Sequence, residues 1–366
     1  MMQRRIRTGI IGCGKVTHLH ARALSAIPES EFVAIYSRDV NKARQFAEQY
    51  HVLPYSSIKE MVEKEKLEAV IICTPHPNHA AGSISAMESG ANVLIEKPMA
   101  STVEDCHRMM KVAAENKLLL GIVCQRRFYA PALRVKKAID EGKIGKPILG
   151  TVQMLGWRDE SYYKSDPWRG KWLEEGGGVL VNQAPHQLDL LQWYMGEIDE
   201  LYGCWANQNH PYIEVEDTAV AVLRFKSGAL GNIVVSNSQH PALFGKVHVH
   251  GSNGASIGVQ TDGGAMFIAG MTGITEPPVN DIWTIPGEQQ MQEIWKKEDI
   301  DFFNAVNAVD YFHERQVEDF LRAIIEGRRP LVTARDGLVT VEIFSAIYRS
   351  QRSHQPVKFP LAPEDI

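Results

Sequence analysis

The chain has 366 residues, of which 44% are hydrophobic and 23% are charged, and this composition is typical of globular proteins. A formal net charge of −5 argues against nucleic acids and anionic membrane surfaces as partners. No apolar run approaches the roughly 20 residues of a membrane-spanning helix, and Arg4 and Arg5 lead directly into a strand without an export signal. The five cysteines lack CxxC spacing, which predicts reduced thiols, no metal site and a cytoplasmic protein.

Two domains are expected from the length, and residues 1–124 form the first. Short apolar runs alternate there with amphipathic stretches, a pattern typical of βαβ units and a doubly wound parallel sheet. The predicted strands are Thr8–Ile11, Phe32–Tyr36, Ala69–Cys73, Asn92–Ile95 and Leu118–Cys124. The predicted helices are Val16–Ala26, Lys42–Gln49, His79–Ser89 and Val103–Asn116.

Residues 125–366 form the second predicted domain, an α+β unit with a mainly antiparallel open sheet and helices on one face. Its strands are predicted at Pro147–Met154, Leu201–Ala206, Asp217–Phe225, Ala229–Ser236 and Gly245–His250. Its helices are predicted at Pro131–Glu141, Val179–Met195, Ala305–Gly327 and Arg335–Ser350. Residues 260–300 are rich in Gly and Pro and receive no assignment.

A glycine turn follows the first predicted strand and opens the first helix. The sequence Gly12-Cys13-Gly14 in this context indicates a dinucleotide-binding fingerprint, with the pyrophosphate at the helix N-terminus. Thr17 stands where a third Gly or Ala is usual, which puts close helix–strand packing in question. His18 and His20 in this helix are predicted to be packing or capping residues.

The choice between NAD and NADP is read at the end of the second strand. Ser37 stands there in place of the acidic residue that would hold a ribose hydroxyl, and Arg38 follows it. A guanidinium can pair with a 2′-phosphate, so the sequence slightly favours NADP. NAD is not excluded, because Asp39 can also reach a ribose.

Polar residues follow two further strands, at Thr74–His79 and at Glu96–Pro98. Ligands bind outside the carboxyl ends of the strands in an open parallel sheet, so both tips are expected to line one crevice. The residues predicted to contact the cofactor are Gly12, Gly14, Lys15, Val16, Ser37, Arg38, Thr74, Pro75, His79, Glu96, Lys97 and Gln125.

The stretch GGGVLVNQAPHQLD, residues 176–189, places three glycines before a polar stripe. In a helix, Asn182, His186 and Asp189 share one face, and Pro185 is expected to kink or restart that helix. A metal site, a phosphate loop and a purely structural stripe are alternatives, but histidine best fits proton transfer near pH 7. We expect the glycines to let the helix begin very close to the nicotinamide and substrate.

An aromatic and basic loop precedes those glycines and is predicted to be exposed. Aromatic rings stack on sugar faces and guanidinium groups bind vicinal hydroxyls, although Trp, Tyr and Arg also mark subunit interfaces. Together with the segment after residue 124, the predicted substrate contacts are Lys97, Arg127, Tyr163, Trp168, Arg169, Trp172, Asn182 and His186.

Six segments, taken in order and spacing, resemble the Gfo/Idh/MocA family, the group of glucose–fructose oxidoreductase and inositol dehydrogenase. They are GCGKVT, TPHPNH, EKP, GGGVLVNQAPHQLD, VEDTAVAVLRFKSGALG and HERQVEDFLRAIIEGRRP, and they span nearly the whole chain. The resemblance implies an N-terminal Rossmann domain, a C-terminal α/β domain whose sheet joins a homo-oligomer (dimer or tetramer), and hydride transfer between NAD(P) and a secondary alcohol.

The resemblance also implies residue roles. By this resemblance Lys97 orients the reacting oxygen and His186 is the general acid/base. We also expect Asp189 or Asn182 to orient the pair. The family often has Asp where this chain has Asn182, a departure that removes a negative charge beside His186.

We therefore expect oxidation of a ring secondary alcohol, with C3 of a glucose-like pyranoside preferred and inositol 2-dehydrogenation as the alternative. A non-catalytic sugar- or redox-sensing binding protein remains a rival. A cofactor that never leaves, while one sugar is oxidised and another reduced, is a third possibility.

Overall fold

The computed structural model describes residues 4–261 and 276–362. These residues divide into two compact units, one formed by residues 1–125 with 309–338 and the other by residues 126–308 with 339–366. The first segment of the first unit ends at residue 125, and residues 309–338, which the sequence analysis placed in the second domain, belong to the first unit. Among the described residues, no helix combines the length and apolarity of a membrane span.

The first unit contains a six-stranded parallel sheet in the order β3-β2-β1-β4-β5-β6. Its strands are β1 (Ile6–Ile11), β2 (Ser30–Tyr36), β3 (Leu53–Tyr55), β4 (Ala69–Ile72), β5 (Asn92–Ile95) and β6 (Leu120–Ile122). The chain moves outward from β1 to β3 and then returns to β4, so the strand order reverses between β1 and β4. Ligands bind at such a switch point in open α/β sheets.

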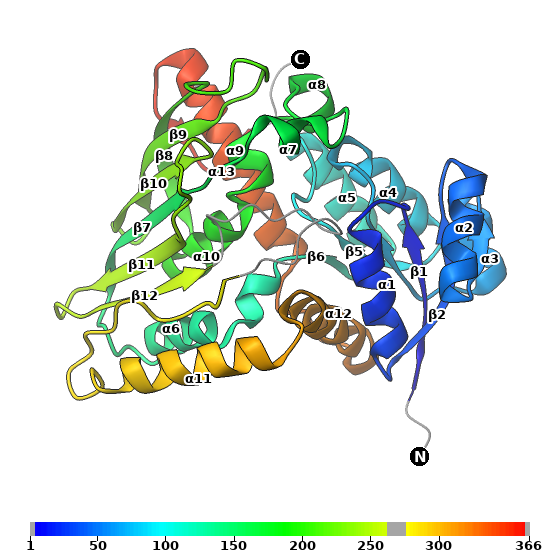
Figure 1. Cartoon of the computed structure of the whole chain (residues 1–366), viewed down its shortest axis with the longest axis horizontal. Coiled ribbons are helices and arrows are strands. Elements are labelled where there is room, and N and C mark those ends of the chain that lie inside the picture. Colours follow the sequence, from blue (N-terminus) through cyan, green and yellow to red (C-terminus); the bar gives the residue numbers. More distant parts are fainter. Residues whose placement is uncertain (1–3, 262–275, 363–366) are drawn as a thin grey trace. The chain divides into compact units, whose positions relative to one another are not determined.

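Helices cover both faces of this sheet (Figure 1). They are α1 (Thr17–Ala26), α2 (Val40–Tyr50), α3 (Ile58–Glu65), α4 (His79–Glu88), α5 (Val103–Glu115) and α12 (Ala308–Glu326). Buried side chains of α1, α2 and α12 share one core with β1, β2 and β4, whereas α3 and α4 contact the other face. The predicted doubly wound sheet is confirmed, and β3 and α3 are additional to the predicted elements.

The helix α12 explains why residues 309–338 belong to the first unit. The Gln316 side chain donates to the Ile122 carbonyl over 2.6 Å and accepts from the Cys124 N–H over 2.8 Å. A Cβ built on Gly121 would lie 3.1 Å from the Phe320 ring, so Phe320 occupies the space that a side chain at position 121 would need. The apolar face of α12 therefore completes the core beside β6, which sequence order alone does not indicate.

The second unit contains a seven-stranded sheet in the order β12-β11-β7-β10-β9-β8-β13, and among the described strands of this sheet only β7 and β10 pair in parallel. Its strands are β7 (Pro147–Leu155), β8 (Ile198–Ala206), β9 (Thr218–Phe225), β10 (Leu230–Ser236), β11 (Gly245–Gly251), β12 (Ser256–Thr261) and β13 (Val357–Lys358). The mainly antiparallel sheet is confirmed, and β12 and β13 are additional to the predicted strands.

The helices of the second unit lie on one side of that sheet (Figure 1), where α6, α9 and α10 contact its strands. They are α6 (Ala130–Asp140), α7 (Glu160–Lys164), α8 (Trp172–Glu175), α9 (Val179–Asn182), α10 (Pro185–Met195), α11 (Met291–Ala305) and the C-terminal part of α13 (Ala334–Ser353). Two short 3₁₀ helices, η1 (His76–Asn78) and η2 (Gln125–Phe128), complete the described elements. The opposite face of the sheet carries the exposed positions of β8, β9 and β10.

Candidate active site

The glycine turn between β1 and α1 has the geometry that a dinucleotide-binding loop requires. Gly12 has φ +117°, and a Cβ there would lie 2.7 Å from the Cys73 carbonyl oxygen, so only glycine fits. Gly14 has open space beside its Cα, with the nearest atom 3.9 Å from a built Cβ. A pyrophosphate can therefore approach the backbone at Gly14.

Thr17 replaces the usual third Gly or Ala without disturbing this turn. Its side chain is fully buried; the hydroxyl donates to the Gly12 carbonyl over 3.2 Å and accepts from the Gly14 N–H over 3.0 Å. The hydroxyl thus links the two ends of the glycine turn, and Thr17 is compatible with close packing of α1 against β1.

The tips of β4 and β5 are tied together by His79. The ring is fully buried, with Nδ1 2.9 Å from the Pro98 carbonyl and Nε2 2.8 Å from the Thr74 carbonyl. Burial lowers the pKa of His79. Both ring nitrogens face protein carbonyls, so His79 positions the two tips instead of offering a nitrogen to the cofactor.

Several polar atoms at this carboxyl edge suit a bound polar group. Thr74 Oγ1, Ser101 Oγ and Gln125 Oε1 are buried and have no hydrogen-bond partner among the described residues. Unsatisfied buried polar atoms are uncommon in proteins and call for a partner. Together with the cradle at Gly12 and Gly14, they fit a nicotinamide dinucleotide.

Glu96 and Lys97 follow β5 as predicted, and the structure adds His20 and His313 beside Glu96. Glu96 Oε1 lies 2.7 Å from His20 Nε2, and Oε2 accepts from the Lys97 N–H over 3.0 Å. Burial opposes ionisation of Glu96, but the His20 hydrogen bond and the charges of His20, His313 and Lys97 outweigh it and lower the pKa to about 2. An ionised Glu96 therefore anchors the start of the Lys97 segment.

Within residues 4–261 and 276–362, one group of possible metal ligands has all its ligand atoms within 4.8 Å of one another. It consists of His20, Glu96 and His313. The short His20–Glu96 contact is a hydrogen bond, and we assign the group to the network behind Lys97. No sequence signal finds it, because the three residues are far apart along the chain.

The end of β2 holds the residues that bear on cofactor choice. Asp39 caps α2, where its Oδ1 accepts from the Asn41 and Lys42 N–H groups over 3.0 and 3.4 Å. Ser37 accepts from the Asp39 N–H over 3.2 Å, and Arg38 is exposed. The one carboxylate in this turn is thus occupied by the helix.

In the second unit, Glu216 holds the glycine stretch. Its carboxylate accepts from the Gly178 and Leu180 N–H groups over 2.9 and 3.0 Å and from the Tyr348 hydroxyl over 3.0 Å. Burial outweighs these hydrogen bonds and raises the pKa of Glu216 to about 7. Sequence reasoning missed Glu216, because its role depends on neighbours about 38 positions away.

The glycines are needed for close approach to protein atoms. A Cβ on Gly178 would lie 1.9 Å from the Glu216 carbonyl oxygen, and one on Gly177 would lie 2.1 Å from the Tyr348 hydroxyl. The prediction that they make room beside nicotinamide and substrate is therefore replaced by a finding: they allow α9 to begin against Glu216 and Tyr348.

The predicted helix Val179–Met195 is divided into α9 and α10, and α10 begins at Pro185. The expected restart just before His186 is confirmed, and its cause is the absent N–H of proline. The Gln183 and Ala184 N–H groups both donate to the Val179 carbonyl, and Leu188 N–H donates to Ala184. The backbone thus keeps turning through the junction, so Asn182 lies about one helical turn before His186, which is 6% exposed.

Asp189 and Arg127 bond to each other. Arg127 Nε donates to Asp189 Oδ2 over 2.8 Å and Nη2 donates to Oδ1 over 2.6 Å, with both side chains 1% exposed. Arg127 also lies over the Trp193 ring. A bidentate buried pair of this kind is costly to break, so we leave Asp189 out of the catalytic set and Arg127 out of the substrate contacts.

The aromatic loop is largely packed, contrary to the prediction that it is exposed. Tyr162 and Tyr163 are buried, and Arg169 donates to the Tyr162 hydroxyl over 2.5 Å and lies over the Trp168 ring. Trp172 donates to the Glu214 carbonyl over 3.0 Å. These aromatic and cationic groups satisfy one another, which the composition of the loop does not reveal.

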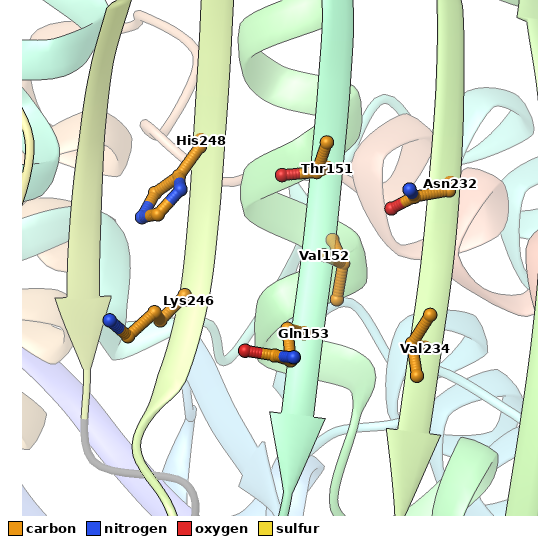
Figure 2. A pocket seen from close by; sticks show the side chains of 7 residues that line it. All are labelled: Thr151, Val152, Gln153, Asn232, Val234, Lys246 and His248. Carbon is orange, nitrogen blue, oxygen red and sulfur yellow. The ribbon is translucent and has the colours of Figure 1, made fainter.

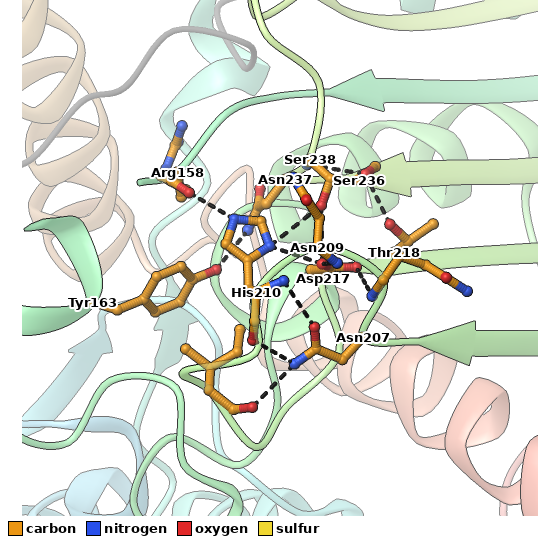
Figure 3. A network of polar contacts seen from close by, with 12 residues as sticks. Arg158, Tyr163, Asn207, Asn209, His210, Asp217, Thr218, Ser236, Asn237 and Ser238 are labelled. Atoms are coloured by element: carbon orange, nitrogen blue, oxygen red, sulfur yellow. Dashed lines mark hydrogen bonds and ion pairs between the residues drawn. The ribbon is translucent and has the colours of Figure 1, made fainter. Parts of the chain in front are cut away.

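A buried polar network ties this loop to the sheet (Figure 3). His210, fully buried, lies 2.8 Å from Asp217 through Nδ1 and 2.7 Å from the Arg158 carbonyl through Nε2. Asn237 donates to Gln183 over 2.9 Å, so the same network reaches the residue between α9 and α10. It fixes the loop next to the helix that carries His186.

Comparison with known proteins agrees with this architecture. Residues 6–123 match the model of the oxidoreductase family's NAD-binding Rossmann fold, and residues 136–359 match that of its C-terminal alpha/beta domain.

Named relatives match nearly the full length of the chain. The scyllo-inositol 2-dehydrogenase (NAD(+)) of Bacillus subtilis is 25% identical over 98% of this chain and 97% of its own length. The inositol 2-dehydrogenase of Rhizobium meliloti is 26% identical over 94% and 96%. The WlbA dehydrogenase of Bordetella pertussis, solved with NADH and UDP-GlcNAcA, is 29% identical and superposes with a TM-score of 0.85 over 99% of this chain and all of that one. The chain is an oxidoreductase that belongs to the Gfo/Idh/MocA family.

Proposed function

We propose that the protein is a cytoplasmic NAD(P)-dependent dehydrogenase that oxidises a secondary alcohol on a sugar ring, with C3 of a glucose-like pyranoside as the preferred position. The observation that carries this proposal is the full-length likeness to the WlbA dehydrogenase, which was solved with a nucleotide-linked sugar acid. The inositol dehydrogenases among the relatives support the alternative, oxidation of an inositol at C2.

In this mechanism the nicotinamide, when bound, supplies the hydride acceptor. His186 takes the hydroxyl proton as the C–H hydride leaves, so the alcohol becomes a ketone and His186 holds the proton. Lys97 orients the reacting oxygen, and Glu96 and His79 hold the segment from which Lys97 projects. Asn182 orients His186.

The experiment mixes the protein with NAD or NADP and a panel of nucleotide-linked pyranosides, simple glycosides, free sugars and inositols, and follows reduced nicotinamide. Turnover of pyranosides is expected, with the product ketone located by NMR. Turnover of inositols alone would reject the pyranoside and support the alternative. Binding without turnover would support a sensing protein, and nicotinamide released only by denaturing fresh protein would identify a retained cofactor.

The cofactor preference is tested at Arg38. We propose that its exposed guanidinium at the end of β2 pairs with a 2′-phosphate, because Asp39 is engaged as the α2 cap. Arg38→Ala is expected to lower kcat/KM for NADP about tenfold or more, the effect of one charge-assisted pair, with little change for NAD. Arg108→Ala on α5 is the control. Equal effects on both cofactors would contradict the assignment.

We propose that the face of the second sheet opposite its helices contacts a second copy of the chain. Its exposed apolar side chains are Tyr202, Val220, Val222 and Leu230, which are 38–58% exposed, and contiguous apolar surface of this kind marks interaction sites. Beside them lies a hollow of about 260 Å³ (Figure 2), smaller than the roughly 300–1,000 Å³ of typical ligand pockets. We therefore treat it as part of the same face.

Val222→Lys is expected to convert the proposed oligomer to a smaller species in light scattering, because the lysine would be buried without a partner. Lys226→Ala, at the turn beyond this strand, is the control. A wild-type monomer would reject the interface.

A further inference from the structure

A buried carboxylate contacts the residue at which this chain departs from its family. Glu175, the last residue of α8, is 1% exposed, and its Oε1 accepts from Asn182 Nδ2 across the glycine stretch. Its Oε2 accepts from the Gly170 N–H over 2.5 Å. Gly176, with φ +83°, turns the chain back after α8 and lets the two side chains meet.

This contact decides which way the Asn182 amide faces. Both Glu175 oxygens accept hydrogen bonds, one from the Gly170 N–H and the other from Asn182, so the NH₂ group of Asn182 faces Glu175. The planar amide then turns its carbonyl oxygen, Oδ1, to the other side. Asn182 thus presents an acceptor, as an aspartate would, and the Glu175 carboxylate lies on the opposite side of its amide.

The charged and titratable groups around Glu175 come from three directions. Tyr162 and Tyr163 lie on α7, Tyr348 lies on α13, and Arg158 and Arg169 belong to the aromatic loop. Burial, and after it the charges of Glu216 and Glu175, raises the pKa of Tyr348, and burial likewise raises the pKa of Tyr162 despite the two arginines. Both phenols therefore stay neutral.

We propose that Glu175 is a positioning residue for the reaction: it holds the Asn182 amide so that Oδ1 faces His186 and stabilises the protonated imidazole. This role rests on the proposed function, because it assumes that His186 accepts the substrate proton. It extends that function by naming the group that supplies the charge missing at position 182.

The test exchanges the two groups. Glu175→Gln removes the charge and replaces one accepting oxygen with an NH₂ group, which then faces a donor at either Asn182 or the Gly170 N–H. Asn182→Asp places two carboxylates against each other. In the double variant E175Q/N182D, the new carboxylate at position 182 accepts from the new amide at position 175, so the hydrogen bond is restored with the charge moved forward. Glu174→Gln, an exposed neighbour on α8, is the matched control.

We expect Glu175→Gln to lower kcat about 10–100-fold, with KM nearly unchanged, and to move the acid limb of the kcat–pH profile about one unit lower, because His186 loses a nearby negative charge. Asn182→Asp is expected to lower both kcat and Tm. The double variant is expected to recover kcat to within about threefold of wild type and to recover Tm.

Two results would overturn the role. One is a Glu175→Gln enzyme with the kcat and pH profile of Glu174→Gln; the other is a double variant no more active than the single variants. If the single variants fold poorly, the double variant still distinguishes a positioning role from a structural one. A merely structural Glu175 predicts that the double variant recovers Tm but not the pH profile. If wild type turns over no substrate, the proposed function fails, whereas the Tm coupling still reports whether the two side chains pair.

Discussion

Replacing His186 with alanine is expected to lower kcat/KM by about 10²–10⁴-fold, the usual contribution of a positioned acid/base. The side chain is 6% exposed and belongs to the second residue of α10, and truncation to alanine removes the proposed proton acceptor. Binding of the cofactor is expected to persist, because the predicted cofactor contacts lie in the first unit.

Steady-state rates with the substrate from the panel, and cofactor binding by fluorescence, check this expectation. The matched control is His107→Ala, which removes an exposed imidazole from α5. Loss of only a few-fold in His186→Ala would reject the acid/base role.

Gly178→Ala is expected to destabilise the second unit by about 3 kcal/mol or more, because its methyl group would overlap a backbone atom. The new Cβ would lie 1.9 Å from the Glu216 carbonyl oxygen. That oxygen cannot move freely, since it accepts from the Val179 N–H over 3.1 Å, and the Glu216 side chain holds the same segment. In a domain of this size the loss corresponds to a fall in Tm of about 6–12 °C.

Differential scanning calorimetry of Gly178→Ala and of a control variant measures this effect. Gly82→Ala is the control, because a Cβ there meets Ile11 at an ordinary 3.5 Å and alanine favours a helix interior by about 1 kcal/mol. A Gly178→Ala protein as stable as Gly82→Ala would show that the approach of α9 to Glu216 is not obligatory.

The alternatives for residues 176–189 can now be weighed. For the metal alternative, Asp189 is already paired with Arg127, and the group with metal-ligand spacing among the described residues consists of His20, Glu96 and His313. The phosphate-loop alternative loses its basis because the Gly178 N–H is already bonded to a protein carboxylate. The structural alternative holds for Asp189, whose partner is Arg127. Asn182 and His186 remain the residues on which the proposed chemistry depends.

The sequence alone predicted the doubly wound sheet, the glycine turn at Gly12 and Gly14, the break at Pro185 and the family. Each of these depends on local signals, namely hydrophobic period, turn chemistry and motif order. The strand β3 (Leu53–Tyr55) was missed because it is only three residues long, too short for a periodic pattern.

Only the tertiary structure decided which polar side chains satisfy one another. It paired Arg127 with Asp189, Glu216 with Gly178, Glu96 with His20, and Glu175 with Asn182, and it packed α12 against the first sheet. The physical reason is that burial obliges a charged or polar group to find a partner, while composition and spacing do not say which partner the fold brings within reach.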